Sequence, residues 1–153
     1  MNHSPELDQL APALCGLQAK IEAAPRNANN KQYGAYADLP TCWSTVQPLL
    51  AEYGLSIVQT FQPTDRDEVC ITTTLLHKSG QYISGTLNLP YGRNGGPQGA
   101  GAAVTYGRRY GLAAIVGLVT DKDDDAQGAQ NDYQNQRSRG PVKGGNDLDD
   151  LLN

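Results

Sequence analysis

A periodic run of small residues in the second half of the chain places the strongest constraint on the fold. Over residues 98–118, small residues recur at every fourth position, at Gly99, Ala103, Gly107 and Gly111. In a helix these positions share one face, yet each glycine inside a helix costs about 1 kcal/mol relative to alanine. Close packing offsets such a cost when a face without bulky side chains lets a sheet or another backbone approach. We therefore predict a helix here that packs tightly on its neighbour.

Three runs rich in β-branched and aromatic residues precede this helix. They cover Leu55–Gln62, Glu68–Lys78 and Gln81–Leu89, and such residues favour strands. The first two runs are joined through residues 63–67 and the last two through a tight turn at Ser79-Gly80. We predict a three-stranded antiparallel β-meander with one packed face and one polar face, because apolar residues alternate with threonines.

Two amphipathic helices are predicted at the start of the chain. The first spans about residues 5–24, with Ser4 as its N-cap, and the second spans about residues 39–53, capped by Asp38 and stopped by Gly54. A short strand or an extended entry to the second helix is expected over residues 33–37. The second helix is predicted to turn five large residues inward: Trp43, Val46, Leu49, Leu50 and Tyr53. The fold class is therefore α+β, with N-terminal helices, the meander and then the Gly/Ala-rich helix.

The net charge of -4 is concentrated at the C-terminal side. Residues 1–120 carry eight Lys or Arg against eight Asp or Glu, whereas residues 121–153 carry four against eight. The second stretch is also rich in Asp, Gln, Asn and Gly, a composition typical of disorder. We predict one domain over residues 1–125 and a disordered acidic tail over residues 126–153.

Metal sites, disulfides and membrane segments are not expected. Cys15, Cys42 and Cys70 are odd in number and widely spaced, which favours buried reduced thiols. His3 and His77 lie too far from any cysteine for a zinc site, and His77 is expected to be exposed near a hairpin turn. No apolar run reaches the roughly 20 residues of a membrane helix, and no secretory signal is visible. We predict a cytoplasmic protein.

Two further runs suggest chemistry, but their context argues against it. Residues 99–103 are glycine-rich, but no βαβ alternation surrounds them and no Gly-Lys-Ser/Thr follows, so nucleotide binding is not expected. Asp121 and Asp123–Asp125 could hold a divalent cation, although a solvated charge run is favoured because adjacent Asp side chains diverge. We predict no cofactor, with a divalent cation left open, and no covalent catalysis.

The segment from Thr105 to Tyr110 is the most informative about function. Arg108 and Arg109 lie between Tyr106 and Tyr110. Cations that neutralise phosphates, combined with aromatic faces that stack on bases, are typical of sequence-tolerant single-strand binding. On composition alone, a core tyrosine pair with the arginines in salt bridges is equally weighted.

Several motifs in a fixed order connect this segment to a known family. They are QGAGAAVTYGRRYGL at 98–112 followed by Asp123–Asp125, YGAYADL at 33–39, YGL at 53–55, and TTLLHKSG at 73–80. Together they resemble the ERF (essential recombination function) family of single-strand-annealing recombinases found in phages. The resemblance covers about residues 5–127. It departs from the family pattern at Gly107 and Gly111, where alanine is frequent, and at Ala126, where glycine is usual.

The resemblance implies ATP-independent binding of single-stranded DNA and annealing of complementary strands in homologous recombination. It also implies a β-β-β-α core, assembly of copies into rings or filaments, and no enzymatic activity. The expected partners are single-stranded DNA, further copies of the chain, and a host single-stranded-DNA-binding protein or a phage exonuclease. We predict a basic groove with stacking tyrosines, made of Arg108, Arg109, Lys31, Tyr106, Lys78, Arg93 and Tyr33.

The C-terminal tip resembles the acidic tips of bacterial single-stranded-DNA-binding proteins. It consists of Asp147, Leu148, Asp149, Asp150, Leu151 and Leu152. We predict that it docks on a partner or mimics DNA in the protein's own groove, with a plain solubilising tail as an equal alternative.

Two other function classes stay open at this point. A protein that only protects single-stranded DNA would bind it without faster annealing. A metal-dependent nuclease would use the run from Asp121 to Asp125 and would cleave DNA in the presence of magnesium.

Overall fold

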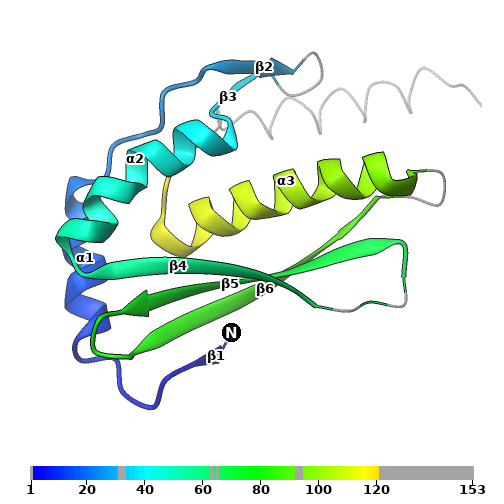
Figure 1. The fold of residues 1–153 in the computed structure, drawn as a ribbon. Helices are drawn as coiled ribbons and strands as arrows, with labels where there is room; N and C mark the ends of the chain where they lie inside the picture. Colours follow the sequence, from blue (N-terminus) through cyan, green and yellow to red (C-terminus); the bar gives the residue numbers. More distant parts are fainter. Residues whose placement is uncertain (1, 31–33, 63, 65, 92–94, 121–153) are drawn as a thin grey trace, which may run out of the picture. The chain divides into compact units, whose positions relative to one another are not determined.

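The computed structural model describes residues 2–30, 34–62, 64, 66–91 and 95–120, and the predicted domain boundary and tail lie outside these residues. Within them the fold is α+β, with three helices and antiparallel sheets, which confirms the predicted fold class (Figure 1). The elements are β1 (Asn2–His3), α1 (Leu10–Lys20), β2 (Ala28–Asn30), β3 (Gly34–Tyr36), α2 (Leu39–Glu52), β4 (Leu55–Gln62), β5 (Glu68–His77), β6 (Tyr82–Pro90) and α3 (Gly96–Val116).

The main sheet has four strands in the order β1-β6-β5-β4. Strand β5 pairs antiparallel with β4 along Leu55–Gln62 and with β6 from Glu68 opposite Pro90 to Leu76 opposite Tyr82. Gly80, at φ 90°, makes the tight turn between β5 and β6 possible. Strands β2 and β3 form a separate hairpin just before α2.

Helix α3 lies over one face of the sheet and makes its closest approach through glycines (Figure 1). A Cβ atom added at Gly107 would overlap Ile71, and one added at Gly111 would overlap the Thr73 hydroxyl. The small-residue face therefore packs on β5, as predicted from its spacing. Gly101 differs, because nothing lies within 4 Å of an added Cβ there.

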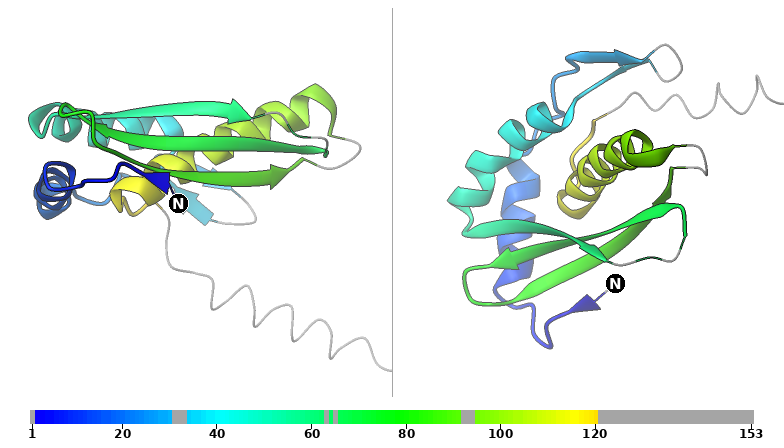
Figure 2. Two further views of the ribbon diagram at one scale, coloured as in Figure 1. Left: turned by 90° about the horizontal axis from the view of Figure 1, so that it is seen from below. Right: turned by 45° about the vertical axis from the view of Figure 1, so that its right-hand side comes forward.

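The two faces of the sheet have different chemistry. Ile71, Thr73, Leu75 and His77 of β5 are buried beneath the helices, whereas the alternating residues Thr72 to Leu76 are partly exposed on the other face. None of the three described helices covers this second face in the view from below (Figure 2). The expectation that His77 is exposed was wrong: it is 8% exposed, and its Nδ1 lies 2.8 Å from the Ser79 hydroxyl.

The first helix is shorter than the sequence predicted. Ser4 does not cap a helix; its backbone N–H donates to the Tyr82 carbonyl at 2.9 Å, which continues the pairing of β1 with β6. The chain must leave this strand before it can turn, so α1 begins only at Leu10. Cys15 on α1 is exposed and Cys70 is partly exposed, so of the three free cysteines only Cys42 is buried as predicted.

Helix α2 begins and ends where the sequence indicates. Asp38 is its N-cap, since its carboxylate accepts the Thr41 N–H at 2.9 Å. Gly54 follows its end with φ 64°, in the left-handed region that favours glycine. The predicted inward orientation of Trp43 was wrong, because Trp43 is 39% exposed. None of the described helices is long and apolar enough to cross a membrane.

Candidate nucleic-acid interface

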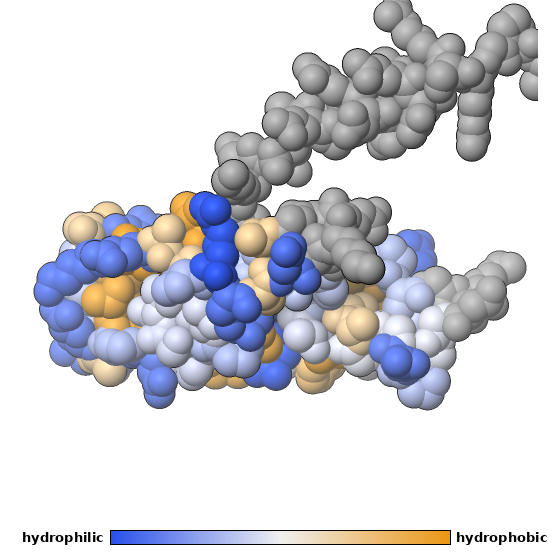
Figure 3. Space-filling view, turned by 90° about the horizontal axis from the view of Figure 1, so that it is seen from above, coloured by the Kyte–Doolittle hydropathy of each residue, from blue (hydrophilic) through white to orange (hydrophobic). Residues whose placement is uncertain are grey.

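A groove of about 420 Å³ opens between α2 and β4, beside α3. Helix α2 contributes one wall and β4 the other, and among the described residues that line the groove Arg108 of α3 is the one cation. The lining residues are Leu39, Pro40, Trp43, Ile57, Gln59, Phe61 and Arg108. Seen from the helix side, apolar residues form separate patches among hydrophilic ones (Figure 3).

Gln59 holds Arg108 at this groove. The Gln59 amide nitrogen donates to the Arg108 carbonyl at 2.8 Å and to the Thr73 hydroxyl at 3.1 Å. In return the Arg108 Nε donates to the Gln59 side-chain oxygen at 3.4 Å. One amide thus contacts both the backbone and the side chain of Arg108, which nevertheless remains exposed.

Two exposed aromatic side chains flank the same groove. Trp43 is 39% exposed on α2, and Phe61 is 57% exposed on β4. Sequence reasoning missed both as site residues, since Trp43 fits the apolar spacing of its helix and Phe61 fits that of its strand. The only available signal was that each is a large aromatic residue.

Arg109 lies in the opposite environment. It is only 5% exposed, and its guanidinium lies 4.4 Å from the ring centre of Tyr36, 5.3 Å from that of Tyr106 and 5.0 Å from that of Tyr110. One of its nitrogens donates to the Ala37 carbonyl at 3.1 Å. Cation–π contacts of this kind stabilise a desolvated guanidinium. Arg109 therefore joins α3 to the junction between β3 and α2.

The electrostatics at this junction involve Asp38. Hydrogen bonds from the side chain and the backbone N–H of Thr41 lower the pKa of the Asp38 carboxyl below its usual value of 3.8. Asn27 and the positive charge of Arg109 make smaller contributions in the same direction. A carboxylate that accepts backbone hydrogen bonds is favoured in its charged form. The start of α2, which carries Leu39 and Pro40 of the groove, is thus fixed by a charged cap.

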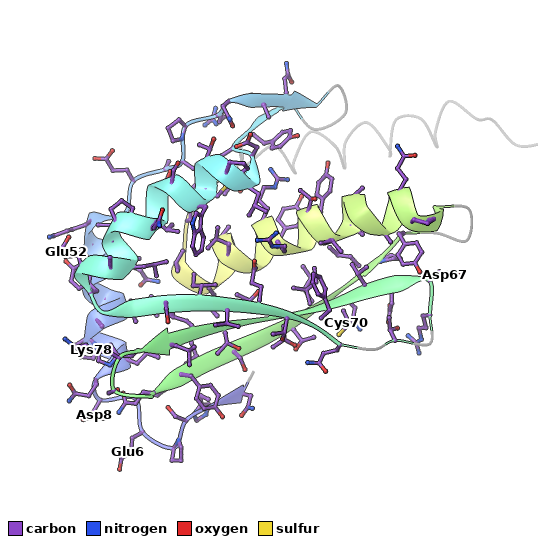
Figure 4. All side chains as sticks on the ribbon, in the orientation of Figure 1. Glu6, Asp8, Glu52, Asp67, Cys70 and Lys78 are labelled. Carbon is purple, nitrogen blue, oxygen red and sulfur yellow. The ribbon has the colours of Figure 1, made fainter. Side chains whose placement is uncertain are left out.

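The structure brings together only part of the predicted set of DNA-binding residues. Tyr106 and Tyr110 pack against each other, with ring centres 5.9 Å apart, on the side of Arg109. Lys78 is exposed beyond the end of β5, at the opposite end of the sheet from Cys70 (Figure 4). Lys31, Tyr33 and Arg93 lie outside the described residues, as do the run from Asp121 to Asp125 and the acidic tip at 147–152.

A metal centre has no support in the part of the chain that the structure describes. No group of three or more His, Cys, Asp or Glu side chains there could hold a metal ion. The groove itself is apolar apart from Gln59 and Arg108. Its chemistry suits a ligand with a planar apolar part and a negative charge.

In the comparison with protein-family models, the model of the ERF superfamily matches residues 10–149. The chain belongs to the ERF superfamily. Membership implies a role in single-strand annealing during recombination, since proteins of this superfamily are annealing proteins and act on single-stranded DNA. No curated protein and no solved structure matches the chain significantly.

The ERF match spans the three helices and β2 to β6, so it includes every residue that lines the groove. Strand β1 lies before the matched residues. The ERF core of this chain therefore carries both the exposed arginine and the buried one.

Proposed function

We propose that this ERF protein binds single-stranded DNA through the groove between α2 and β4 and anneals complementary strands without ATP. The observation that carries the proposal is Arg108, an exposed cation held by Gln59 beside an exposed tryptophan. An arginine neutralises a phosphate, and an indole ring stacks on a base of any sequence. Binding of this kind leaves the remaining bases displayed for pairing.

Arg109 has a different role in this proposal. Because it is buried among three tyrosines, it positions the walls of the groove rather than contacting phosphate. Lys78, Lys31 and Arg93 extend the basic path along the DNA, and Tyr33 adds a further stacking surface. These four remain predictions from the sequence.

The assembly and partners follow the same proposal. Copies of the chain line up in a ring or filament so that their grooves form one path for the DNA. The acidic tip at 147–152 docks on a host single-stranded-DNA-binding protein or an exonuclease, or competes with DNA for the groove. Annealing needs no cofactor, and a divalent cation enters only as a condition of the assay. The protein acts in the cytoplasm.

The first test compares three single substitutions in the full chain: Arg108→Ala, Trp43→Ala and Arg66→Ala. Binding of a fluorescent single-stranded oligonucleotide is measured across a salt series. Removing one phosphate contact reduces the slope of log affinity against log salt by about 0.7, and removing one stacked base costs about 1–3 kcal/mol. Arg66 is an exposed arginine away from the groove and serves as the charge-matched control.

We expect Arg108→Ala to lower both affinity and salt slope, Trp43→Ala to lower affinity without changing the slope, and Arg66→Ala to change neither. Equal behaviour of Arg108→Ala and Arg66→Ala would contradict the groove assignment. Annealing of two labelled complementary oligonucleotides without ATP then separates the functions. Binding without faster annealing indicates a protective protein, and cleavage in magnesium indicates a nuclease.

A further inference from the structure

The buried face of β5 carries a hydroxyl group between two apolar side chains. Thr73 is only 4% exposed, and Ile71 and Leu75, which flank it along that face, are buried still more completely. A valine would fill nearly the same space, and burying a hydroxyl group costs free energy unless it is hydrogen-bonded. Packing alone therefore gives no reason for a threonine at this position, and its hydrogen bond does.

The Thr73 hydroxyl accepts this hydrogen bond from the residue directly opposite on β4. Gln59 pairs with Thr73 in the register of the two strands, and its Nε2 lies 3.1 Å from the Thr73 Oγ1. Gly111 of α3 packs on the same hydroxyl, since a Cβ added at this glycine would overlap it. The hydroxyl is thus enclosed between β4 and α3, and it offers Gln59 an acceptor in a fixed place.

Two acceptors on different elements set the orientation of the Gln59 amide. Its Nε2 also donates to the Arg108 carbonyl at 2.8 Å, and a carbonyl can only accept, so the nitrogen and not the oxygen faces this part of α3. With Nε2 held by both acceptors, Oε1 has a fixed direction, and the Arg108 Nε donates to it at 3.4 Å. The Thr73 hydroxyl therefore helps to determine where the guanidinium group of Arg108 is held.

We infer that Thr73 is a positioning residue for Arg108 and acts through the Gln59 amide. The inference rests on the proposed function, in which the exposed Arg108 binds phosphate. Thr73 is buried and does not contact DNA; its hydroxyl keeps the amide, and with it the guanidinium group, in one arrangement before DNA binds. Holding a long side chain in place beforehand favours binding, because less side-chain entropy is lost when the complex forms.

The test uses two substitutions of the same residue in the full chain. Thr73→Val removes the hydroxyl and keeps the branched shape, whereas Thr73→Ser keeps the hydroxyl. Thr72→Val is the matched control, because Thr72 is the next residue of β5 but its hydroxyl lies 3.0 Å from that of Thr86, on the open face of the sheet. Thr73→Val is also combined with Arg108→Ala. Binding of a fluorescent single-stranded oligonucleotide is measured across a salt series, and urea denaturation gives the folded fraction of each variant.

We expect Thr73→Val to lower the affinity for single-stranded DNA about 2- to 10-fold, the cost of ordering one long side chain on binding. The salt slope should not change, because Arg108 keeps its charge. Thr73→Ser and Thr72→Val should bind as tightly as the unchanged chain. In the Arg108→Ala background, Thr73→Val should have no further effect, since substitutions within one hydrogen-bond network are not additive. A merely structural contribution of Thr73 would lower the affinity equally in both backgrounds.

Proton exchange of the Gln59 side-chain amide, followed by NMR, gives a second measurement that needs no DNA. We expect these protons to exchange with water faster in Thr73→Val than in the unchanged chain, Thr73→Ser or Thr72→Val. Full affinity of Thr73→Val, an equal loss in both backgrounds, or unaltered exchange at Gln59 would overturn the inference, while weaker binding of Arg108→Ala would still support the groove. Full affinity of Arg108→Ala would instead overturn the proposed groove, and with it any role of Thr73 in DNA binding.

Discussion

Arg108 and Arg109 are neighbours in α3, yet their side chains differ in exposure and in the groups that they contact. Arg108 is exposed and contacts only Gln59 among the side chains of the groove. Arg109 is buried among three tyrosine rings and donates to the Ala37 carbonyl. Consecutive residues of a helix point about 100° apart, so one sequence motif serves two surroundings.

The difference shows that two adjacent arginines can have separate roles, one in binding a ligand and one in stabilising the fold. A solvated cation contributes little to folding and keeps its charge for a ligand. A buried guanidinium contributes to packing and is shielded from ligands, so it stabilises the fold. Of the two alternatives left open for this motif, the core tyrosine pair is found only as a contact between the two rings, because Tyr110 is 39% exposed. DNA binding is proposed for Arg108.

The largest expected effect comes from Arg109. Arg109→Ala removes three cation–π contacts and one buried hydrogen bond, and we expect the free energy of unfolding to fall by about 2–4 kcal/mol. Arg108→Ala should change it by less than about 0.5 kcal/mol. Urea denaturation of both variants measures the difference. If the two variants lose equal stability, the division of roles is wrong.

A glycine pair on α3 gives the next largest effect. Gly111→Ala places a methyl group against the Thr73 hydroxyl, which also accepts from Gln59, and overpacking of this kind costs about 1–3 kcal/mol. Gly101→Ala meets nothing within 4 Å and should stabilise the helix by about 1 kcal/mol. Thermal unfolding of the two variants should therefore shift in opposite directions. A shift in the same direction would show that α3 does not pack on β5 through this face.

The smallest expected effect concerns the cap beside Arg109. The folded-state pKa of Asp38 is lowered, mainly by Thr41, so its charged form adds stability that is complete above the unfolded pKa and is lost as pH falls through the folded one. Asp38→Asn keeps a capping oxygen but does not titrate. Between about pH 5 and about pH 3 the unchanged chain should lose more stability than Asp38→Asn. Parallel pH profiles would exclude a charged cap.

The sequence predicted correctly those features that depend on residues close together in the chain. The cap at Asp38, the glycine after α2 and the small-residue face of α3 are all confirmed. Each depends on the chemistry of a few consecutive or periodically spaced residues. The α+β class followed from their order.

Long-range contacts escaped prediction. Ser4 has the sequence signature of a helix cap, but its backbone pairs with Tyr82, far along the chain. Trp43 fits the inward spacing of α2, yet the groove between α2 and β4 leaves it exposed. The sequence does not show whether Arg108 or Arg109 is buried, because Tyr36, which covers Arg109, belongs to another element. The candidate site could not be predicted from the sequence, because it depends on how separate elements are arranged in space.

Ala37 also bears on the kinetics of folding. Its carbonyl accepts from Arg109 and its N–H donates to the Thr120 carbonyl, so two segments distant in sequence are tied to it. Hairpins such as β4–β5 and β5–β6 close short loops and form fast, whereas contacts between distant segments form slowly. We expect the junction around Ala37 to form after the sheet, late in the folding reaction, and to open first. Amide exchange at Ala37 would then report partial opening well below the free energy of global unfolding.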